Sequence, residues 1–300
     1  MTATSQTRTL WSALAGVPLL FAAIASLQVQ IDARTQSVAQ EREELLMRSG
    51  AALKKLSVGY DSLLADIYWT RAVQYYGARV GTQNPDFSLL WPLLDLTTTL
   101  DPKLVAAYRF GAIFLSEKGA GGAGRADLAI ELVKRGIASN PDVWQLDTDL
   151  GFLYYWRLKD YPNSAAAYLQ GSKNPKAPVW LKLMAARVAE KGGSTDTSAL
   201  IWSEIYQSNN NPSVRKFALQ QLRELKVGQD EAHLDDLIGQ YRKRFGHYPS
   251  ATNELVNAKL LPGIPVDPAG VPYVIGPDGK SKLDPRSPVA IETSRQKSPH

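Results

Sequence analysis

The chain has 300 residues, with 34 Lys and Arg against 29 Asp and Glu, and its net charge of +5 is too mild to favour nucleic acid as a partner. It contains no cysteine and only three histidines, which excludes disulfide scaffolds, thiolate nucleophiles and multi-histidine metal sites. We therefore expect no metal and no cofactor, and the composition indicates a globular, helix-rich protein.

The N-terminus carries a long uncharged segment. No charged residue lies between Arg8 and Asp32, and the apolar run 10–29 is long enough to cross a bilayer as a helix. Trp11 lies where an interfacial aromatic anchor is expected. A cleaved signal peptide is one alternative, because small residues occur around 23–26. A buried soluble helix is the other.

We favour an uncleaved single-pass anchor over residues 10–30 that binds the lipid bilayer. Arg8 and the free amine precede this span, so residues 1–9 are predicted to be cytoplasmic. Residues 31–59 then form a membrane-proximal linker. The bulk of the chain is expected in the periplasm, at the inner membrane of a bacterium.

The middle of the chain repeats. Prolines that follow Asp or Asn recur at intervals of 39, 34 and 37 residues. A period near 34 is typical of a two-helix solenoid repeat. Glycine clusters at 119–124 and 192–193 predict turns between helices. The four pairs are Asp101-Pro102, Asn140-Pro141, Asn174-Pro175 and Asn211-Pro212, and the first two are also expected near helix starts.

Internal positions follow the same period. Counted from Pro141, the small residues Gly151 and Ser164 and the large residue Tyr168 fall on the two helices of one hairpin. Small residues let antiparallel helices approach closely. The pattern over residues 60–226 resembles the tetratricopeptide repeat (TPR) family, with Asp147 at a position that often holds Trp. An all-α bundle without repeats is the alternative.

Composition changes after Gly228. Residues 231–245 predict a polar helix that caps the repeats. A weakly alternating segment, 271–275, is followed by Pro277, Asp278 and Gly279, which predicts a small β-hairpin.

The segment 241–284 combines several turn residues in a specific order, namely Gly246, Tyr248, Pro249, Leu255, Pro265, Asp267, Pro268, Gly270, Pro272 and Tyr273. It resembles the globular part of type II secretion major pseudopilins. That resemblance implies a short Leu-rich helix followed by a hairpin. We expect the capping helix and this module over 227–285, and a mobile tail over 286–300.

The predicted fold is therefore all-α: an N-terminal transmembrane helix, a TPR-like α-solenoid and a small C-terminal α+β appendage.

Three patterns suggest chemistry, and each has a plainer interpretation that we favour. Residues 119–124 spell G-x-G-x-x-G, but they follow a predicted helix rather than a strand, so a hairpin turn is favoured over nucleotide binding. His233 with Asp235 and Asp236 resembles an acid/base cluster, but a solvated helix face is favoured. Asp278 and Asp284 are candidate calcium ligands through the pseudopilin resemblance, but ordinary turn residues are favoured. No catalytic residue is predicted.

The first helix of each TPR-like hairpin is expected to line a concave face. An aromatic groove of this kind suits an extended peptide or a helix. The alternative is that Phe152, Tyr155 and Trp156 pack against adjacent helices, or that Trp156 stacks with Arg157. The predicted partner-binding residues are Tyr108, Gln145, Thr148, Phe152, Tyr155, Trp156 and Lys182, with Leu115 and Val179 beside them.

The expected function is that of a membrane-anchored protein-interaction scaffold in a bacterial envelope assembly of the pilus or secretion type. Its partner is expected to be a protein, which the sequence does not identify. One rival is a structural accessory subunit of a large membrane complex. Another is an envelope hydrolase with accessory repeats, for which the sequence supplies no convincing carboxylate pair.

Overall fold

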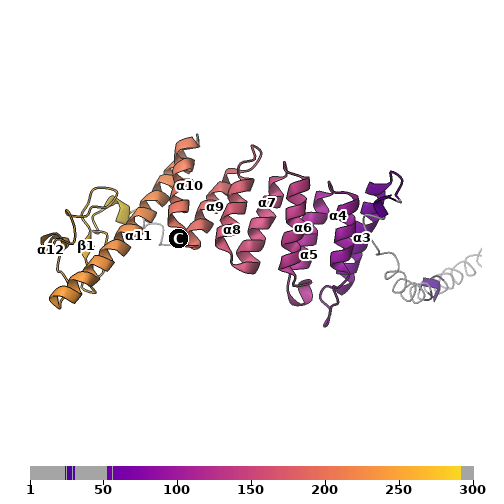
Figure 1. Ribbon diagram of the computed structural model, residues 1–300, viewed down its shortest axis with the longest axis horizontal. Helices are drawn as coiled ribbons and strands as arrows, with labels where there is room; N and C mark the ends of the chain where they lie inside the picture. The colour runs from indigo at the N-terminus through magenta and orange to yellow at the C-terminus, as the bar shows by residue number, and fades with distance from the viewer. Residues whose placement is uncertain (1–23, 25, 29, 31–52, 56, 292–300) are drawn as a thin grey trace, which may run out of the picture. The chain divides into compact units, whose positions relative to one another are not determined.

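The computed structural model describes residues 24, 26–28, 30, 53–55 and 57–291. The chain divides into two compact units, residues 1–128 and 129–300, and each is described by itself. The described part is mostly helical, with a small two-stranded hairpin near its C-terminal end (Figure 1).

The first unit contains α3 (Asp61–Arg79), α4 (Leu90–Leu100), α5 (Val105–Ser116) and the short turn η1 (Gly119–Gly121). Helices α3 and α4 pack against each other. The rings of Tyr76 and Phe114 stack with their centroids 3.9 Å apart, which joins α3 to α5. The division between the units falls within α6 (Ala126–Ser139).

The second unit begins with a run of helices in which each packs against the next. Their core consists of small and aliphatic residues around Trp202, which is fully buried. The helices are α7 (Trp144–Phe152), which continues as a π-helical segment η2 (Leu153–Leu158), then α8 (Tyr161–Gly171), α9 (Val179–Lys191), α10 (Thr195–Ser208) and α11 (Pro212–Phe245).

The contact between α7 and α8 depends on small residues. A side-chain carbon added at Gly151 would lie 2.5 Å from the ring of Tyr168, so only glycine fits. The Ser164 hydroxyl donates a hydrogen bond of 2.7 Å to the carbonyl of Gly151. Gly151 and Ser164 therefore allow the close approach that their size predicts.

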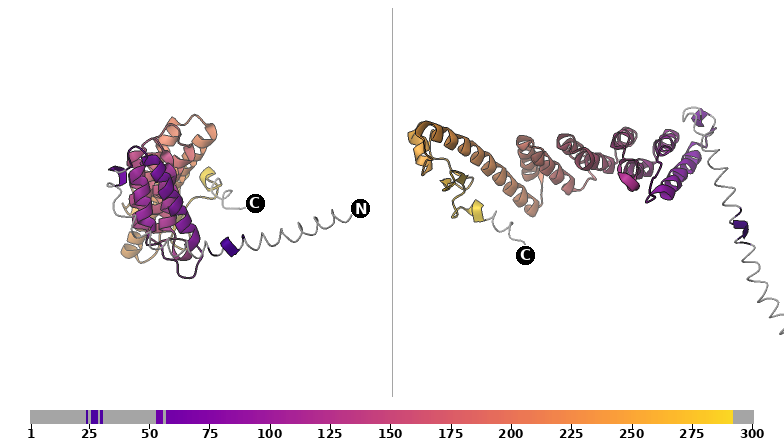
Figure 2. Two further views of the ribbon diagram at one scale, coloured as in Figure 1. Left: turned by 90° about the vertical axis from the view of Figure 1, so that its right-hand side faces the viewer. Right: turned by 90° about the horizontal axis from the view of Figure 1, so that it is seen from below.

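The C-terminal module lies on the second half of α11 (Figure 2). It comprises α12 (Thr252–Asn257), β1 (Val274–Ile275) and β2 (Ser281–Lys282). The two strands pair in an antiparallel register, with Val274 opposite Lys282. The predicted hairpin is thus confirmed.

Three boundary predictions are wrong. Helix α11 runs through Gly228 without a break, because Leu225, Val227 and Leu234 on either side are buried and outweigh the low helix propensity of glycine. The mobile tail does not begin at 286, since Ser287 and Val289 are buried in the module.

The third error concerns the Asx-Pro pairs. Asn211 caps α11, and its side chain accepts a hydrogen bond from the Ser213 amide. Asp101 and Asn140 instead follow the ends of α4 and α6. The Asn140 side chain donates back to the Gly136 carbonyl, which closes the preceding helix rather than opening the next.

Within the described ranges, no helix combines the length and apolar character that crossing a membrane requires. The predicted anchor over 10–30 lies almost entirely outside the described residues. Only 24, 26–28 and 30 are described, and they are helical.

Candidate functional site

A cluster of aromatic side chains lies where α7 passes into η2. Phe152 is 44% exposed and Trp156 is 55% exposed, whereas Tyr155 and Tyr161 are half-buried. The Tyr155 ring centroid lies 5.3 Å from that of Trp156 and 5.4 Å from that of Tyr161, and Phe152 lies 6.2 Å from Trp156. We call these four residues the aromatic patch. Large exposed rings gathered in one place are unusual on a protein without a partner there.

The local backbone that carries the patch departs from α-helical geometry. The π-helical segment η2 is wider than an α-helix, so the side chains after Leu153 are rotated relative to α-helical spacing. Lys159 ends it in the left-handed conformation, with φ of 58°. Single π-helical turns occur frequently at functional sites.

Two lysines, Lys159 and Lys191, contact the rings of the aromatic patch. The Lys191 ammonium donates a 2.6 Å hydrogen bond to the Tyr155 hydroxyl, which raises the pKa of Lys191, and it lies 4.6 Å from the Tyr155 ring centroid. The Lys159 ammonium lies 4.9 Å from the Trp156 centroid. Among the described residues, neither ammonium pairs with a carboxylate. Aromatic rings therefore provide their principal stabilising contacts.

Helix α9 runs beside α7 and η2. Near one end the rings of Trp144 and Trp180 meet edge to face, 6.3 Å apart, and near the other end Lys191 reaches Tyr155. Met184, one turn after Trp180, is 39% exposed between these contacts. We call Trp180, Met184 and Lys191 the α9 stripe. It extends the aromatic patch into a broader apolar surface with positive charge at its edge.

The structure brings together three of the predicted binding residues, Phe152, Tyr155 and Trp156. Gln145 and Thr148 lie on α7 and are partly exposed. Val179 is 47% exposed, next to Trp180 at the start of α9.

Three predicted residues are misplaced. Lys182 forms an ion pair with Glu204 of α10, because it lies about 200° around the helix from Trp180. Tyr108 and Leu115 are each only 1% exposed, because the buried side of α5 carries them while Phe110 and Ile113 face outward.

The sequence analysis missed the α9 stripe, Lys159 and Tyr161. The stripe had a usable signal, since Trp180, Met184 and Lys191 follow helical spacing. The π-helical turn has no recognisable signal in the sequence.

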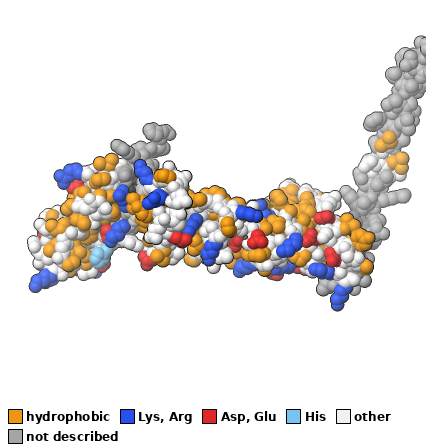
Figure 3. Space-filling view, turned by 90° about the horizontal axis from the view of Figure 1, so that it is seen from above, with side chains coloured by type: hydrophobic (Ala, Val, Ile, Leu, Met, Phe, Trp, Pro, Cys, Tyr) orange, Lys and Arg blue, Asp and Glu red, His pale blue; other side chains and the backbone are white. Residues whose placement is uncertain are grey.

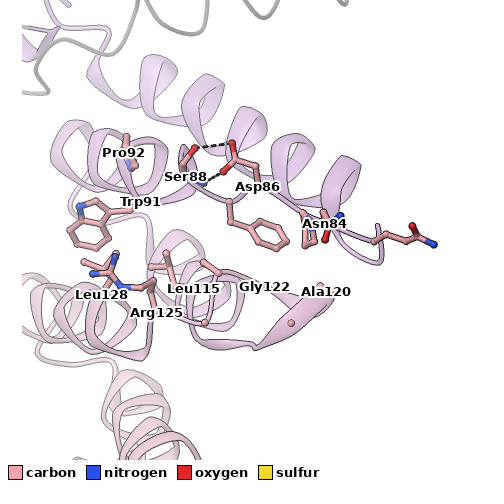
Figure 4. A pocket seen from close by; sticks show the side chains of 16 residues that line it. Asn84, Asp86, Ser88, Trp91, Pro92, Leu115, Ala120, Gly122, Arg125 and Leu128 are labelled. Carbon is pink, nitrogen blue, oxygen red and sulfur yellow. Dashed lines mark hydrogen bonds between the residues drawn. The ribbon is translucent and has the colours of Figure 1, made fainter.

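A concavity lies within the first unit, between residues 83–92 and the glycine-rich loop (Figure 4). Its volume is about 860 Å³, and Trp91, Leu115 and Leu128 form much of its apolar wall. Asp86 lines it as well, and hydrogen bonds from the Ser88 amide and hydroxyl lower the pKa of Asp86, so this carboxyl stays ionised.

The G-x-G-x-x-G loop lines that concavity without providing a phosphate site. The amides of Ala123, Gly124 and Arg125 donate to carbonyls near the end of α5. The Arg125 guanidinium is engaged by Asp127 through two hydrogen bonds. The loop follows a helix, as predicted, and its backbone closes that helix rather than cradling an anion.

The His233 cluster is divided. His233 and Asp236 are exposed, as expected of a solvated face. Asp235 is not solvated in this way, because its carboxylate accepts hydrogen bonds from the Ser281 amide at 2.8 Å and the Ser281 hydroxyl at 2.9 Å. Asp235 therefore fastens the hairpin to α11.

The two candidate calcium ligands are engaged by neighbouring cations. Asp278 pairs with Lys282 at 2.8 Å. Arg286 binds Asp284 through two nitrogens and lowers the pKa of that carboxyl to about 2. No group of three or more potential metal ligands gathers within the part of the chain that the structure describes.

Acidic and basic side chains are interspersed on the face shown in Figure 3. The chain matches no protein-family model and no curated protein.

Proposed function

We propose that this protein is a membrane-anchored interaction scaffold that binds a protein partner through the aromatic patch. The observation that carries this proposal is the clustering of Phe152 and Trp156, each about half-exposed, beside two lysines that have no carboxylate partner among the described residues. Aromatic residues of this kind dominate the energy of protein interfaces.

The exposed area of the aromatic patch is large enough to contribute substantially to the binding free energy of a partner. Fully burying a large apolar side chain contributes about 1.5–3 kcal/mol, so covering the exposed half of each ring contributes roughly half of that. The α9 stripe adds Trp180 and Met184, both partly exposed. A partner segment that covers both groups would gain several kcal/mol before the cost of association.

The helix arrangement supports a TPR-like array as the scaffold. The side-chain amide of Asn174 donates a 2.9 Å hydrogen bond to the carbonyl of Asp142, which joins the loops before α9 and α7. Trp144 and Trp180 make a second contact between corresponding helices of successive hairpins. Such contacts are expected where one helical hairpin stacks on the next.

The setting we propose is the periplasmic side of a bacterial inner membrane. The uncharged run 10–29 supports the anchor. The C-terminal module supports a link to a pilus- or secretion-type assembly, because its helix, turn, short helix and hairpin occur in the order that the pseudopilin resemblance implies. No enzymatic role is proposed.

Co-purification from native membranes tests this function. The full chain and a Phe152→Ala/Trp156→Ala variant are extracted in mild detergent, and proteins that elute with them are quantified by mass spectrometry. We expect at least one partner whose yield falls about tenfold or more with the variant, the effect of losing an interface hot spot. Stoichiometric yield would indicate a permanent subunit rather than an adaptor.

Leu200→Ala is the matched control, because Leu200 is 72% exposed on α10 and belongs to neither the aromatic patch nor the α9 stripe. This variant should retain the partner in full. Circular dichroism should show the same melting temperature for all three proteins. Equal partner yields from the double variant and the wild-type chain would contradict the proposal.

A further inference from the structure

An exposed apolar group lies at the start of the first unit. Val58 is 83% exposed, Tyr60 68%, Leu63 57% and Ile67 44%. Tyr60, Leu63 and Ile67 are spaced by three and four residues, so they lie along one side of α3. We call these four residues the apolar tip.

On the side of α3 that carries Tyr60, Leu63 and Ile67, the large apolar residues end at Ile67, although Val73 on another side of the helix is 40% exposed. The same side of the helix continues with Thr70 and Gln74, which are exposed and polar. A helix that packs along its whole length against another protein would carry an apolar stripe throughout. The short stripe instead suits a surface that only the first turns of the helix touch.

The backbone holds Val58 outward. Val58 has φ of +48° and Gly59 has φ of +90°. The left-handed conformation is costly for a β-branched residue and persists only where surrounding contacts impose it. Here the Tyr60 amide donates 2.9 Å to the Ser57 carbonyl, and the Ser57 hydroxyl contacts the carboxylate of Asp61.

The chemistry around the tip is that of a membrane interface. Lys54 and Lys55 are exposed just before it. Lys54 donates to the Thr99 carbonyl at 3.3 Å. Aliphatic side chains with a tyrosine and flanking lysines are typical of segments that lie in the headgroup region. Asp66 is the exposed acid beside the stripe.

We propose that the apolar tip lies in the headgroup region of the bilayer that the N-terminal anchor crosses. This location of the apolar tip rests on the membrane anchor that is part of the proposed function. Residues 31–52 separate the predicted span from the described start of the unit, and this stretch reaches at most about 75 Å. The tether keeps the tip at a high local concentration near the lipid surface, so a small contact suffices.

The absence of cysteine allows a direct test with the full chain. Val58→Cys, Leu63→Cys and the control Leu200→Cys are each labelled with an environment-sensitive fluorophore. Each protein is reconstituted into vesicles of three parts phosphatidylcholine to one part phosphatidylglycerol. Lipids that carry a nitroxide near the headgroup serve as quenchers.

We expect at least a twofold loss of fluorescence at positions 58 and 63 and none at 200. Absence of quenching at both tip positions would overturn the proposal. A blue-shifted label without quenching would overturn it as well, because protein rather than lipid would then cover the tip. Position 63 keeps the test valid if the Val58 variant fails to fold.

A second arm separates this proposal from the anchor. If the full chain does not fractionate with membranes, the anchor has failed, and the labelled chain is then added to preformed vesicles. Quenching at 58 and 63 in that arm would support lipid binding by the tip itself. No quenching would reject it.

Discussion

The helical hairpins of residues 144–208 and the C-terminal module of residues 246–291 belong to one unit but are held together differently. The hairpins pack through apolar and small residues, with Trp202 fully buried and Gly151 in contact with Tyr168. The module packs on α11 through an apolar cluster that includes Leu234, Ile238 and Tyr273, and carboxylates add long-range hydrogen bonds to this contact. This difference explains why periodicity in the sequence reveals the first region and only partly the second.

Three carboxylates define the polar fastening, namely Asp230 and Asp235 on α11 and Asp267 within the module. Asp235 accepts from Ser281, and Asp230 accepts from the buried hydroxyl of Tyr273 at 3.2 Å. Asp267 is 4% exposed and accepts from the Ser287 hydroxyl and the Val271 amide. The contacts of Asp230 and Asp235 fix the module on the helix, whereas those of Asp267 hold segments of the module to one another.

The largest expected effect is in the hairpins. Trp202→Ala should lower the free energy of unfolding by about 3–5 kcal/mol, because it leaves a cavity in the core. Urea denaturation followed by circular dichroism measures this. Leu200→Ala, at an exposed position on the same helix, should change stability by less than about 0.5 kcal/mol. A loss below 1 kcal/mol for the tryptophan variant would refute the apolar account.

In the C-terminal module, loss of a buried carboxylate should cause the largest decrease in stability. Asp267→Ala should cost about 2–3 kcal/mol, since it leaves buried donors without an acceptor. Hydrogen exchange should accelerate over 265–291 and stay unchanged in α9 and α10. Asp278→Ala removes an exposed ion pair with Lys282 and a hydrogen bond from the Lys280 amide, and it should destabilise the protein much less than Asp267→Ala. Equal effects of the two variants would argue against polar fastening.

Two glycines sharpen the packing argument. Gly151→Ala should destabilise the protein by about 1–3 kcal/mol, because the new methyl group overlaps the Tyr168 ring. Gly239→Ala in α11 meets nothing within 4 Å and should stabilise it by about 0.4–1 kcal/mol. Thermal melts of both variants measure the difference. The same sign of shift for both would contradict the close contact between α7 and α8.

Lowering the pH should destabilise the C-terminal module and stabilise the α7–α8 hairpin. Burial alone would raise the pKa of Asp267, but hydrogen bonds from Ser287 and the Val271 amide lower it, and Arg286 lowers the pKa of Asp284 to about 2. Groups with lowered pKa stabilise the fold above their unfolded value near 3.8. That stabilisation is lost as the pH falls from about 4 towards 2.

Asp147 behaves in the opposite way. Burial between α7 and α8 raises its pKa, so protonation relieves an unfavourable charge as the pH falls through that raised value. Hydrogen exchange corrected for intrinsic rates should show the module opening below pH 4 while α7 and α8 remain protected. Asp147→Asn should stabilise the hairpin at pH 7. Opening of the hairpin before the module would count against these assignments.

The sequence predicts the hairpins well because their signal is local. Glycines at 192–193 end α9, and Gly151 and Ser164 lie at a helix contact, as size and spacing indicate. Contacts between residues that are far apart in the sequence leave no such local signal. The roles of Asp235 and Ser287 depend on partners 46 and 20 residues distant.

Only the part of the candidate site that has a local signal can be predicted from the sequence. Phe152, Tyr155 and Trp156 were found because they are neighbours in the sequence. The sequence does not show which side of α9 faces α7. The contacts of Trp180 with Trp144 and of Lys191 with Tyr155 define that side, and Lys182 lies on another side of the helix. The π-helical turn follows from packing and has no local signature.

Photo-crosslinking shows directly whether another protein binds at the aromatic patch. A photoreactive amino acid is placed at position 156 in the full chain, or at position 200 as the control, and cells are irradiated before membranes are isolated. We expect a discrete adduct with one protein from position 156 and none from position 200. No adduct at 156, or the same adducts from both positions, would contradict a docking role for the aromatic patch.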